Sequence, residues 1–436
     1  MPPKLSDIER IVVVLMENRS FDHQLGYLSL DPAILRVDGL RSDRLWKAAQ
    51  ANPYQGQPCG SFPLLDPSRS IVIDPLHDFR HIATQLQEVN GKFTMKGFVE
   101  SCSSFDPRGH GRLVMGYYTG ADLPTTNAFA TQYGVCDRWF SSLPASTQPN
   151  RLMAMSGLSR IADNTTPLPN QELVYDWLDR KGVPFRVYHS GIPFFTLMLS
   201  RISMIATSPK FRSFDDLAAD FLNEDDDEFP PIIFVEPVYS DAPLLSHPTD
   251  DHAPTPVSGG QHFLAQVYNA LIGNPDRWGH TVLIVTYDEH GGFFDHVPPP
   301  RIPTTPPPDA FYETPFQSLG VRVPGYVLSP FVSPGRIYSE ILDHTSILKF
   351  IGKKFGDATY SEVVDDRTVG NVFDVLDLDE AREDIPAIPV PPLAPAPVVA
   401  QAVNPQQQAF EQAWQQMKKD HPDDSLRKFP DLMRKP

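Results

Sequence analysis

The stretch IERIVVVLM, residues 8–16, decides the fold, because an unbroken run of Ile, Val and Leu is typical of a central strand buried on both faces of a parallel sheet. A second run, TVLIVTY, residues 281–287, has the same character. The first run leads directly into Glu17-Asn18 and the second into Asp288-Glu289-His290. In open α/β sheets, ligands bind beyond the carboxyl ends of the strands. The two runs therefore predict one divalent-metal site with hard oxygen ligands, a kind of site that points towards phosphoester chemistry.

Composition places the chain among soluble globular enzymes, with 41% hydrophobic and 21% charged residues. Its 436 residues are enough for one large α/β domain or two smaller ones. The net charge of -17 argues against a nucleic-acid partner and against adsorption to anionic membranes through charge alone. The three cysteines are odd in number and form no CxxC motif, so neither a disulfide framework nor a structural zinc is expected.

No stretch of the chain approaches the roughly 18 apolar residues that a transmembrane helix needs. The first ten residues are polar, and the apolar run that follows is too short for the core of a secretory signal. We therefore expect a cytoplasmic protein, or a secreted one if a leader precedes the given start. Contact with a membrane, if the substrate is a lipid, is expected to be transient.

Strand and helix patterns alternate along the chain, which favours an α/β sheet. Strands are also predicted over 185–189, 232–235 and 326–328, and helices over 81–89, 124–133, 150–155, 214–222, 261–272 and from 346 onwards. The composition changes near residue 385. We assign 1–384 to the catalytic domain, 385–405 to a Pro/Ala-rich linker and 406–436 to a C-terminal tail with a potential helix, and expect no catalytic residues beyond 384.

The segment from Asp288 to His296 contains three acids and two histidines after a buried strand. Adjacent acids repel one another unless a cation or base neutralises them. The glycine pair after His290 lets the backbone turn tightly beside a ligand. The alternative interpretation is a solvated acidic loop. Glu17-Asn18 alone is equally compatible with a polar turn after a strand.

Thr147 precedes Pro149 in a turn that is expected to open a helix. A hydroxyl at that place faces the positive end of the helix and its free N–H groups, which favour a phosphate or an alkoxide. Threonine becomes a good nucleophile only when a metal or a base lowers its pKa. The alternative is that Thr147 is a helix N-cap.

Five histidines lie in sequence contexts that suit phosphoryl binding, proton transfer or metal ligation. Each of them taken alone is more often structural. They are His77, His252, His290, His296 and His344. The apolar segment 192–199 could line a lipid-facing mouth, and its alternative is buried core.

Four motifs in this order resemble the bacterial phosphoesterase family of phosphatidylcholine-type phospholipases C and related acid phosphatases. They are ENRSFDH at 17–23, MGYY at 115–118, TQPNRL at 147–152 and YDEHGGFFDH at 287–296. The resemblance runs from about residue 8 to residue 352. It implies a three-layer α/β/α sandwich like that of alkaline phosphatase around a mostly parallel sheet. The chain lacks the long C-terminal extension of the larger phospholipases, which weakens the carry-over of their substrate preference.

The resemblance also assigns the site residues. Thr147 matches the metal-bound nucleophile, although Ser146 is adjacent and the Pro-Ala-Ser turn departs from the Gly that many relatives carry before it. The spacing to Pro149 favours Thr147. The metal ligands implied are Glu17, Asn18, Thr147, Asp288 and Glu289, with His77, His252 and His344 at the phosphoryl group and His290, Asp295, His296 and Asn150 around the site.

These observations predict an enzyme that hydrolyses phosphodiesters of phosphatidylcholine-like phospholipids through a phospho-threonine intermediate, with one divalent metal ion. Carboxylate and amide oxygens favour Ca²⁺ or Mg²⁺, and the neighbouring histidines admit Zn²⁺, Mn²⁺ or Fe. The alternatives are a phosphomonoesterase of the acid phosphatase type and a non-catalytic protein that binds metal or phosphate.

Overall fold

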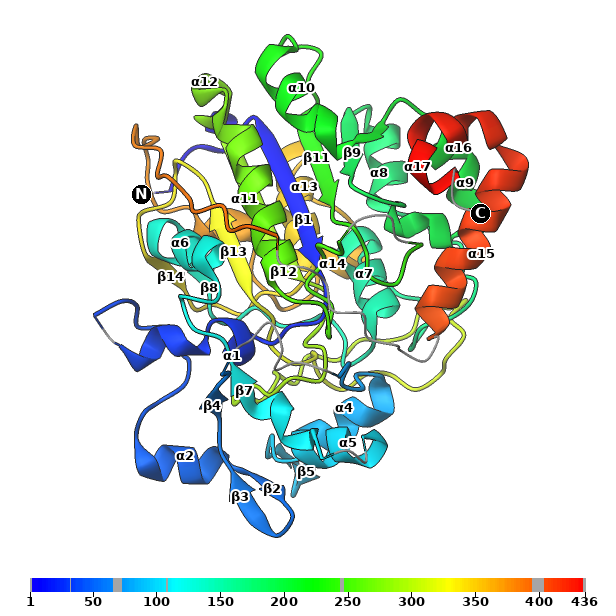
Figure 1. Ribbon diagram of the computed structural model, residues 1–436. Coiled ribbons are helices and arrows are strands. Elements are labelled where there is room, and N and C mark those ends of the chain that lie inside the picture. The colour runs from blue at the N-terminus through cyan, green and yellow to red at the C-terminus, as the bar shows by residue number, and fades with distance from the viewer. Residues whose placement is uncertain are drawn as a thin grey trace.

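A computed structural model describes residues 2–31, 33–65, 73–106, 109–243, 247–393 and 404–433. Its centre is an eight-stranded sheet in the order β10–β9–β11–β1–β12–β13–β8–β14 (Figure 1). All neighbouring strands are parallel except the two pairs that β13 makes. The prediction of a mostly parallel α/β sheet is therefore confirmed. The strands are β1 Arg10–Met16, β8 Gly134–Cys136, β9 Phe185–His189, β10 Phe211–Ser213, β11 Ile232–Glu236, β12 Thr281–Tyr287, β13 Gly325–Leu328 and β14 Arg336–Tyr338.

β1 and β12 lie side by side in the middle of the sheet and pair over their whole length, from Arg10 opposite Thr281 to Met16 opposite Tyr287. Every residue of both strands is buried, as expected for central strands covered on both faces. Since the pairing is in register, the residues that follow the two strands leave the sheet at the same level. This register is what brings Glu17 next to Asp288.

Helices cover both faces of the sheet (Figure 1). One face carries α6 Pro124–Gln132, α10 Leu217–Asn223, α11 Ser258–Ile272 and α12 Pro275–Trp278. The other carries α7 Thr147–Ser156, α8 Val174–Lys181, α13 Thr345–Phe355 and α14 Glu362–Asp365. The molecule is thus the three-layer α/β/α sandwich that the sequence predicts.

Smaller elements lie at the carboxyl end of the sheet, where α4 and α5 pack on each other. They are α1 Phe21–Gln24, α2 Arg44–Gln50, β2 Asn52–Tyr54, β3 Gln57–Cys59, β4 Phe62–Pro63, α4 Phe79–Leu86, β5 Glu88–Val89, β6 Lys92–Phe93, α5 Phe98–Phe105 and β7 Gly116–Tyr117. Short 3₁₀ helices are η1 Leu5–Asp7, η2 Gly26–Leu30, η3 Gly111–Met115, η4 Phe194–Leu197, η5 Leu199–Arg201, η6 Phe214–Asp216 and η7 Val372–Val375.

Several helices differ from their predicted bounds, for example α11, which begins at Ser258 instead of residue 261. Two of them lie beside the site. The helix predicted over 81–89 begins at Phe79, because the Asp78 side chain accepts hydrogen bonds from the first backbone N–H groups. It ends at Leu86, since Gln87 adopts a left-handed conformation and a small hairpin follows. The helix predicted over 150–155 begins three residues earlier, at Thr147, and so includes the proposed nucleophile.

The C-terminal segment packs along the catalytic domain (Figure 1). Tyr268 and Thr125, on α11 and α6, donate hydrogen bonds to the carbonyl oxygens of Pro386 and Pro389. After residue 404, α15 Pro405–Asp420 buries one side against η4 and α9 Ile202–Thr207. The helices α16 Pro422–Lys428 and α17 Pro430–Met433 follow it. None of the helices in the described part of the chain has the length and apolar composition that crossing a bilayer requires.

Candidate active site

The loops after β1 and β12 meet at the carboxyl edge of the sheet. The backbone N–H of Asn18 donates to Asp288 Oδ1 at 3.0 Å. Asn18 has a left-handed φ of 57°, which Asn tolerates better than most residues and which turns the chain sharply after the strand. Gly291 (φ 63°) lies so close that a Cβ there would be 2.2 Å from the Asn18 carbonyl oxygen. The acid-containing loops are therefore locked against each other by backbone contacts.

Thr147 is the first residue of α7 and its hydroxyl points at this junction. Its Oγ1 donates to Asn18 Oδ1 at 3.4 Å. The neighbouring Ser146 hydroxyl instead donates to Asp163. Neither residue caps the helix with its side chain, so the structure does not support the N-cap interpretation. The Asn150 side chain bonds to backbone groups of residues 143–146, including the Ala145 carbonyl at 2.8 Å, and so fixes the turn that presents Thr147.

The carboxylates around this hydroxyl are buried and short of partners. Neither side-chain oxygen of Glu17 has a hydrogen-bond partner, and Oε1 of Glu289 has none either. Burial raises the pKa of Glu17 well above its usual value and that of Asp288 to about 6. Burial also opposes ionisation of Glu289, but the nearby His77 holds its pKa below the usual value. Buried carboxylate oxygens that accept no hydrogen bond are suitable ligands for a hard divalent cation. Glu17 also forms, with Asp241 and His252, one of the clusters of described residues that could hold a metal ion.

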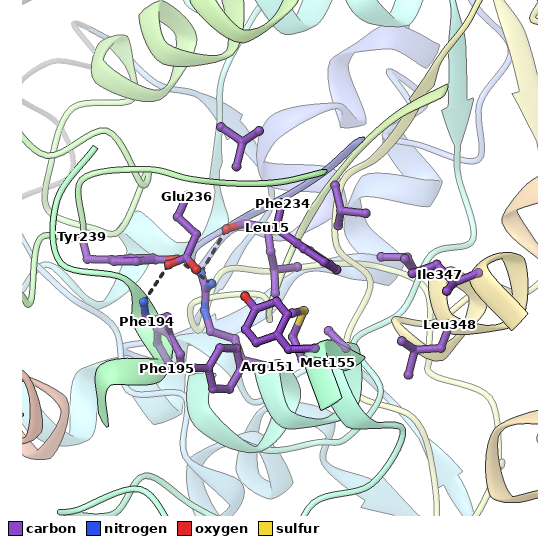
Figure 2. A pocket seen from close by; sticks show the side chains of 15 residues that line it. Leu15, Arg151, Met155, Phe194, Phe195, Phe234, Glu236, Tyr239, Ile347 and Leu348 are labelled. Atoms are coloured by element: carbon purple, nitrogen blue, oxygen red, sulfur yellow. Dashed lines mark hydrogen bonds between the residues drawn. The ribbon is translucent and has the colours of Figure 1, made fainter. Parts of the chain in front are cut away.

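Arg151 supplies the positive charge that the protein itself brings to these acids. It lies one helical turn after Thr147, with Nη2 3.3 Å from Glu17 Oε1 and Nε 3.2 Å from Asp288 Oδ2. Figure 2 shows the Arg151 side chain beside Tyr239 and Glu236. Nη1 donates to the Tyr239 hydroxyl at 3.0 Å, and that hydroxyl donates to Glu236 Oε2 at 3.1 Å. This chain of bonds holds the guanidinium beneath both acids.

Two histidines face the same place from the other side. His77 Nε2 lies 3.2 Å from Asn18 Nδ2 and 3.6 Å from Glu289 Oε1. His252 Nε2 lies 3.4 Å from Asp74 Oδ1, and its Nδ1 lies 3.9 Å from Glu17 Oε2. Burial alone would lower the pKa of both rings, but the surrounding carboxylates outweigh it and raise both pKa values. Both rings therefore favour the protonated form.

A cavity of about 210 Å³ opens over the Thr147 hydroxyl and is lined by His77 and His252. Among its described lining residues none is Lys or Arg. Its acidic residues are Asp74, Asp78, Asp163 and Asp241. Asn404 and Pro405 also line it, although the sequence analysis placed the segment beyond 384 outside the site.

The remaining predicted histidines hold the framework. His344 Nε2 donates to the Asp288 carbonyl at 2.7 Å and Nδ1 accepts from the Trp139 indole, so neither nitrogen is free for a phosphoryl group. Burial lowers the pKa of His344 to about 4, which keeps the ring neutral. His290 Nε2 bonds the Gln85 side chain at 2.8 Å, and its Nδ1 lies beside Glu289.

Asp295 and His296 take part in a different buried network. Arg322 Nε donates to Asp295 Oδ1 at 2.9 Å, and His296 Nδ1 lies 2.7 Å from Asp22 Oδ2. Asp38 completes this network at His296 Nε2. Neither Asp295 nor His296 is among the described residues that line the cavity. With Asp22, these two residues form one of the clusters of described residues that could hold a metal ion.

A family model described as "Phosphoesterase family" matches residues 8–357. The chain belongs to the phosphoesterase family. Non-specific phospholipase C1 of Arabidopsis thaliana is 34% identical over 407 residues, which cover 87% of this chain and 73% of that protein. Phospholipase C B of Mycobacterium tuberculosis is 31% identical over 412 residues, which cover 81% of this chain and 74% of that protein. This phosphoesterase is therefore an enzyme that hydrolyses phosphoester bonds.

Solved structures show weaker likenesses. The match to an alkaline phosphatase superfamily protein from Vibrio parahaemolyticus covers 57% of this chain and 63% of that protein's chain, at 10% sequence identity and a TM-score of 0.30. The match to the lipoteichoic acid synthase LtaP from Listeria monocytogenes covers 95% of this chain and 92% of that chain, at 9% sequence identity and a TM-score of 0.33. Likenesses at this level add nothing to the assignment, which depends on the sequence relatives.

Sequence reasoning missed three residues that the phosphoesterase structure places at its site. Arg151 stands four positions after Thr147, a spacing that puts both on one face of a helix and could have revealed it. Asp74 and Asp241 line the cavity. Asp74 could have been found by its nearness in sequence to His77. Nothing in the sequence around Asp241 distinguishes it from a surface acid.

Proposed function

We propose that this protein is a metal-dependent phosphodiesterase of the phospholipase C type that acts through a phospho-threonine intermediate. The observation that carries the proposal is the Thr147 hydroxyl, 3.4 Å from Asn18 Oδ1, beneath a cavity that two histidines line. The relatives named phospholipase C support a phospholipid as the substrate. The nucleophile, the ion and the intermediate are supported by the geometry alone.

Glu17, Asn18, Asp288 and Glu289, with the Thr147 oxygen, would hold the metal ion. When bound, the ion supplies Lewis-acid stabilisation of negative charge on the nucleophile and on the phosphoryl oxygens. Both carboxylate oxygens of Glu17 and Oε1 of Glu289 are buried and accept no hydrogen bond. This observation fits such an ion. Other clusters of described residues that could hold an ion are Asp74–His77–His252, Glu17–Asp241–His252 and Asp22–Asp295–His296.

The Thr147 hydroxyl gives up its proton to bulk water, from which His252 regains a proton after each turnover. The Thr147 oxygen attacks phosphorus, the Thr147 Oγ–P bond forms, and the P–O bond to the alcohol breaks. His252 lies at the cavity with a raised pKa, so it can give its proton to the departing alkoxide. Water then attacks the phospho-threonine, releases the phosphorylated head group and restores the hydroxyl. His77 complements the charge of the phosphoryl oxygens throughout.

The acidic wall of the cavity favours a diester over a monoester. Asp74, Asp163 and Asp241 line the cavity where the phosphoryl group would bind, and none of its described lining residues is Lys or Arg. A phosphomonoester carries up to two negative charges near neutral pH and a diester one, so the monoester is repelled more strongly. This difference in charge supports the diesterase over the acid-phosphatase alternative.

The test compares nitrophenyl phosphorylcholine with nitrophenyl phosphate as substrates of the purified protein. We expect chelator-sensitive turnover of the diester that exceeds turnover of the monoester. Thr147→Ala should abolish it, while Thr147→Ser, which keeps the hydroxyl, should retain part of it. Equal turnover by Thr147→Ala would exclude the proposed nucleophile, and a preference for the monoester would exclude the diesterase assignment.

A further inference from the structure

The first turn of α15 reaches the active-site cavity, although the family match ends at residue 357. Figure 1 shows α15 running along the side of the molecule, next to α9. Its buried face includes Phe410, Ala413 and Met417. Asn404, directly before its first residue, lines the same cavity as Thr147. A segment outside the family match is therefore built into the wall of the site.

Asn404 makes two different hydrogen bonds at this place. Its Oδ1 accepts from the Gln407 backbone at 2.8 Å and so caps α15. Its Nδ2 donates to Asp241 Oδ1 at 3.0 Å. The other oxygen of that carboxylate lies 4.0 Å from His252 Nδ1. Because Asp241 is buried, its amide partner fixes which way the carboxylate faces.

Phe410 makes a second, independent link one and a half turns further along α15. Its ring stacks on Tyr239, with centroids 5.7 Å apart and planes at 30°, and meets the edge of Phe194 at 6.0 Å. The Arg151 guanidinium lies over the same two rings, 4.9 Å from the Tyr239 centroid and 4.6 Å from the Phe194 centroid. Figure 2 shows Tyr239 and Phe194 next to this arginine, and the two rings also contact each other, with centroids 5.6 Å apart. Through these rings α15 supports the group that holds Glu17 and Asp288.

We propose that α15 is part of the catalytic unit: Asn404 positions Asp241 against His252, and Phe410 positions Tyr239 against Arg151. Neither residue of α15 touches the reacting atoms, so both are positioning residues. The inference rests on the proposed function, because it assumes that His252 and the acids held by Arg151 serve turnover of a phosphodiester.

Two substitutions separate positioning from docking of the helix. Asn404→Ser keeps an oxygen that can cap α15 but is too short to reach Asp241. Phe410→Leu keeps an apolar side chain on the buried face of α15 but removes the aromatic ring that stacks on Tyr239. The matched controls are Asn274→Ser, at the capping residue of α12, and Trp414→Leu, on the same buried face of α15 against Phe429.

We expect both test variants to fold, by circular dichroism and thermal melting, and to lose about tenfold or more in kcat on nitrophenyl phosphorylcholine. KM should stay within about twofold, since a misplaced catalytic group affects the transition state more than substrate binding. The controls should keep the kcat of the unmodified protein even where their melting temperature falls.

Unchanged kcat in folded Asn404→Ser and Phe410→Leu overturns this inference alone, provided the unmodified protein shows turnover that Thr147→Ala removes. A loss of kcat in Trp414→Leu that matches the loss in Phe410→Leu also overturns it, because the role of α15 is then only to keep the domain folded. If the unmodified protein shows no Thr147-dependent turnover, the proposed function fails and this inference fails with it.

Discussion

Arg151 is the residue on which the apo form of the site depends. Its guanidinium is the cation that the described side chains bring within 3.3 Å of both Glu17 and Asp288. Removing one partner of a buried ion pair leaves an uncompensated charge, which costs about 3–5 kcal/mol. We expect Arg151→Met to lose stability of this order in urea unfolding without metal, and to regain much of it with saturating divalent cation.

Arg10→Met is the control for that substitution. Arg10 is as buried as Arg151, but its partners Glu9 and Asp226 are exposed, so its loss strands no buried carboxylate. A variant of Arg10 that loses as much stability as Arg151→Met, or gains as much from the cation, would contradict the role assigned to Arg151.

His296 makes stability depend on pH in a predictable direction. Burial would lower its pKa, but Asp22 outweighs burial and, with a further contribution from Asp38, raises the pKa from 6.5 to about 9. A raised folded-state pKa gives stability that is complete below pH 6.5 and is lost as pH rises through 9. The shift is worth about 3 kcal/mol at about 1.4 kcal/mol per pKa unit.

We therefore expect His296→Gln to lower the free energy of unfolding most at pH 6 and progressively less towards pH 9.5. Urea titrations of His296→Gln and of the unmodified protein across this pH range measure the gap, that is, the difference between their free energies of unfolding. The same substitution at the exposed His280 should produce a small gap with no such trend. A gap for His296→Gln that stays constant from pH 6 to pH 9.5 would show that its protonation does not stabilise the fold.

At the scale of elements, the loop after β12 must approach the loop after β1 with no side chain between them. A Cβ at Gly291 would lie 2.2 Å from the Asn18 carbonyl oxygen. Gly291→Ala should therefore displace Asn18 and, through a shift of about 1 Å, reduce kcat by about a hundredfold. Gly182→Ala is the control, since Gly182 has a similar φ of 66° with no atom within 4 Å of a Cβ.

Gly182→Ala carries only the intrinsic cost of a left-handed alanine, about 1–2 kcal/mol, and should keep full activity. Steady-state kinetics on the diester and thermal melting of both variants make the comparison. If Gly291→Ala behaves like Gly182→Ala in both measurements, the close approach of the two loops does not control the site.

Elements whose residues are buried on both faces could be predicted from the sequence, and those defined by tertiary contacts could not. β1 and β12 could be predicted because all their residues are buried and most are apolar. The acids that directly follow the two strands indicated the site. The start of α7 was missed because Thr147 and Pro149 have weak helix propensity, whereas burial in the first turn holds them in the helix. Asp241 and Asn404, which meet across a long stretch of sequence, leave no local pattern.

At the scale of the whole molecule, composition predicted a linker and then a tail with a potential helix, and the structure has a helix there, α15, which packs against η4 and α9. The described residues 386–389 have little periodicity, so their hydrogen bonds to α6 and α11 could not be predicted from the sequence. The apolar segment 192–199 shows the opposite case. Phe194 and Phe195 are buried in the core around Arg151 rather than exposed at a mouth, so the core alternative was the right one.

Metal removal tests the molecule as a single thermodynamic unit. Burial raises the folded-state pKa of Asp288 to about 6, and that of Glu17 in the same direction. In the metal-free protein these raised pKa values stabilise the fold below the unfolded-state pKa near 4, and this contribution is lost as pH rises through about 6. A bound divalent cation requires the ionised carboxylates, so its stabilising effect grows over the same range. The melting temperature should therefore fall more on chelation at pH 7.5 than at pH 5, and re-addition of a divalent cation should restore it. Glu17→Gln should reduce this dependence on metal. An equal effect of chelator at both pH values, or none at either, would mean that these buried acids do not hold an ion.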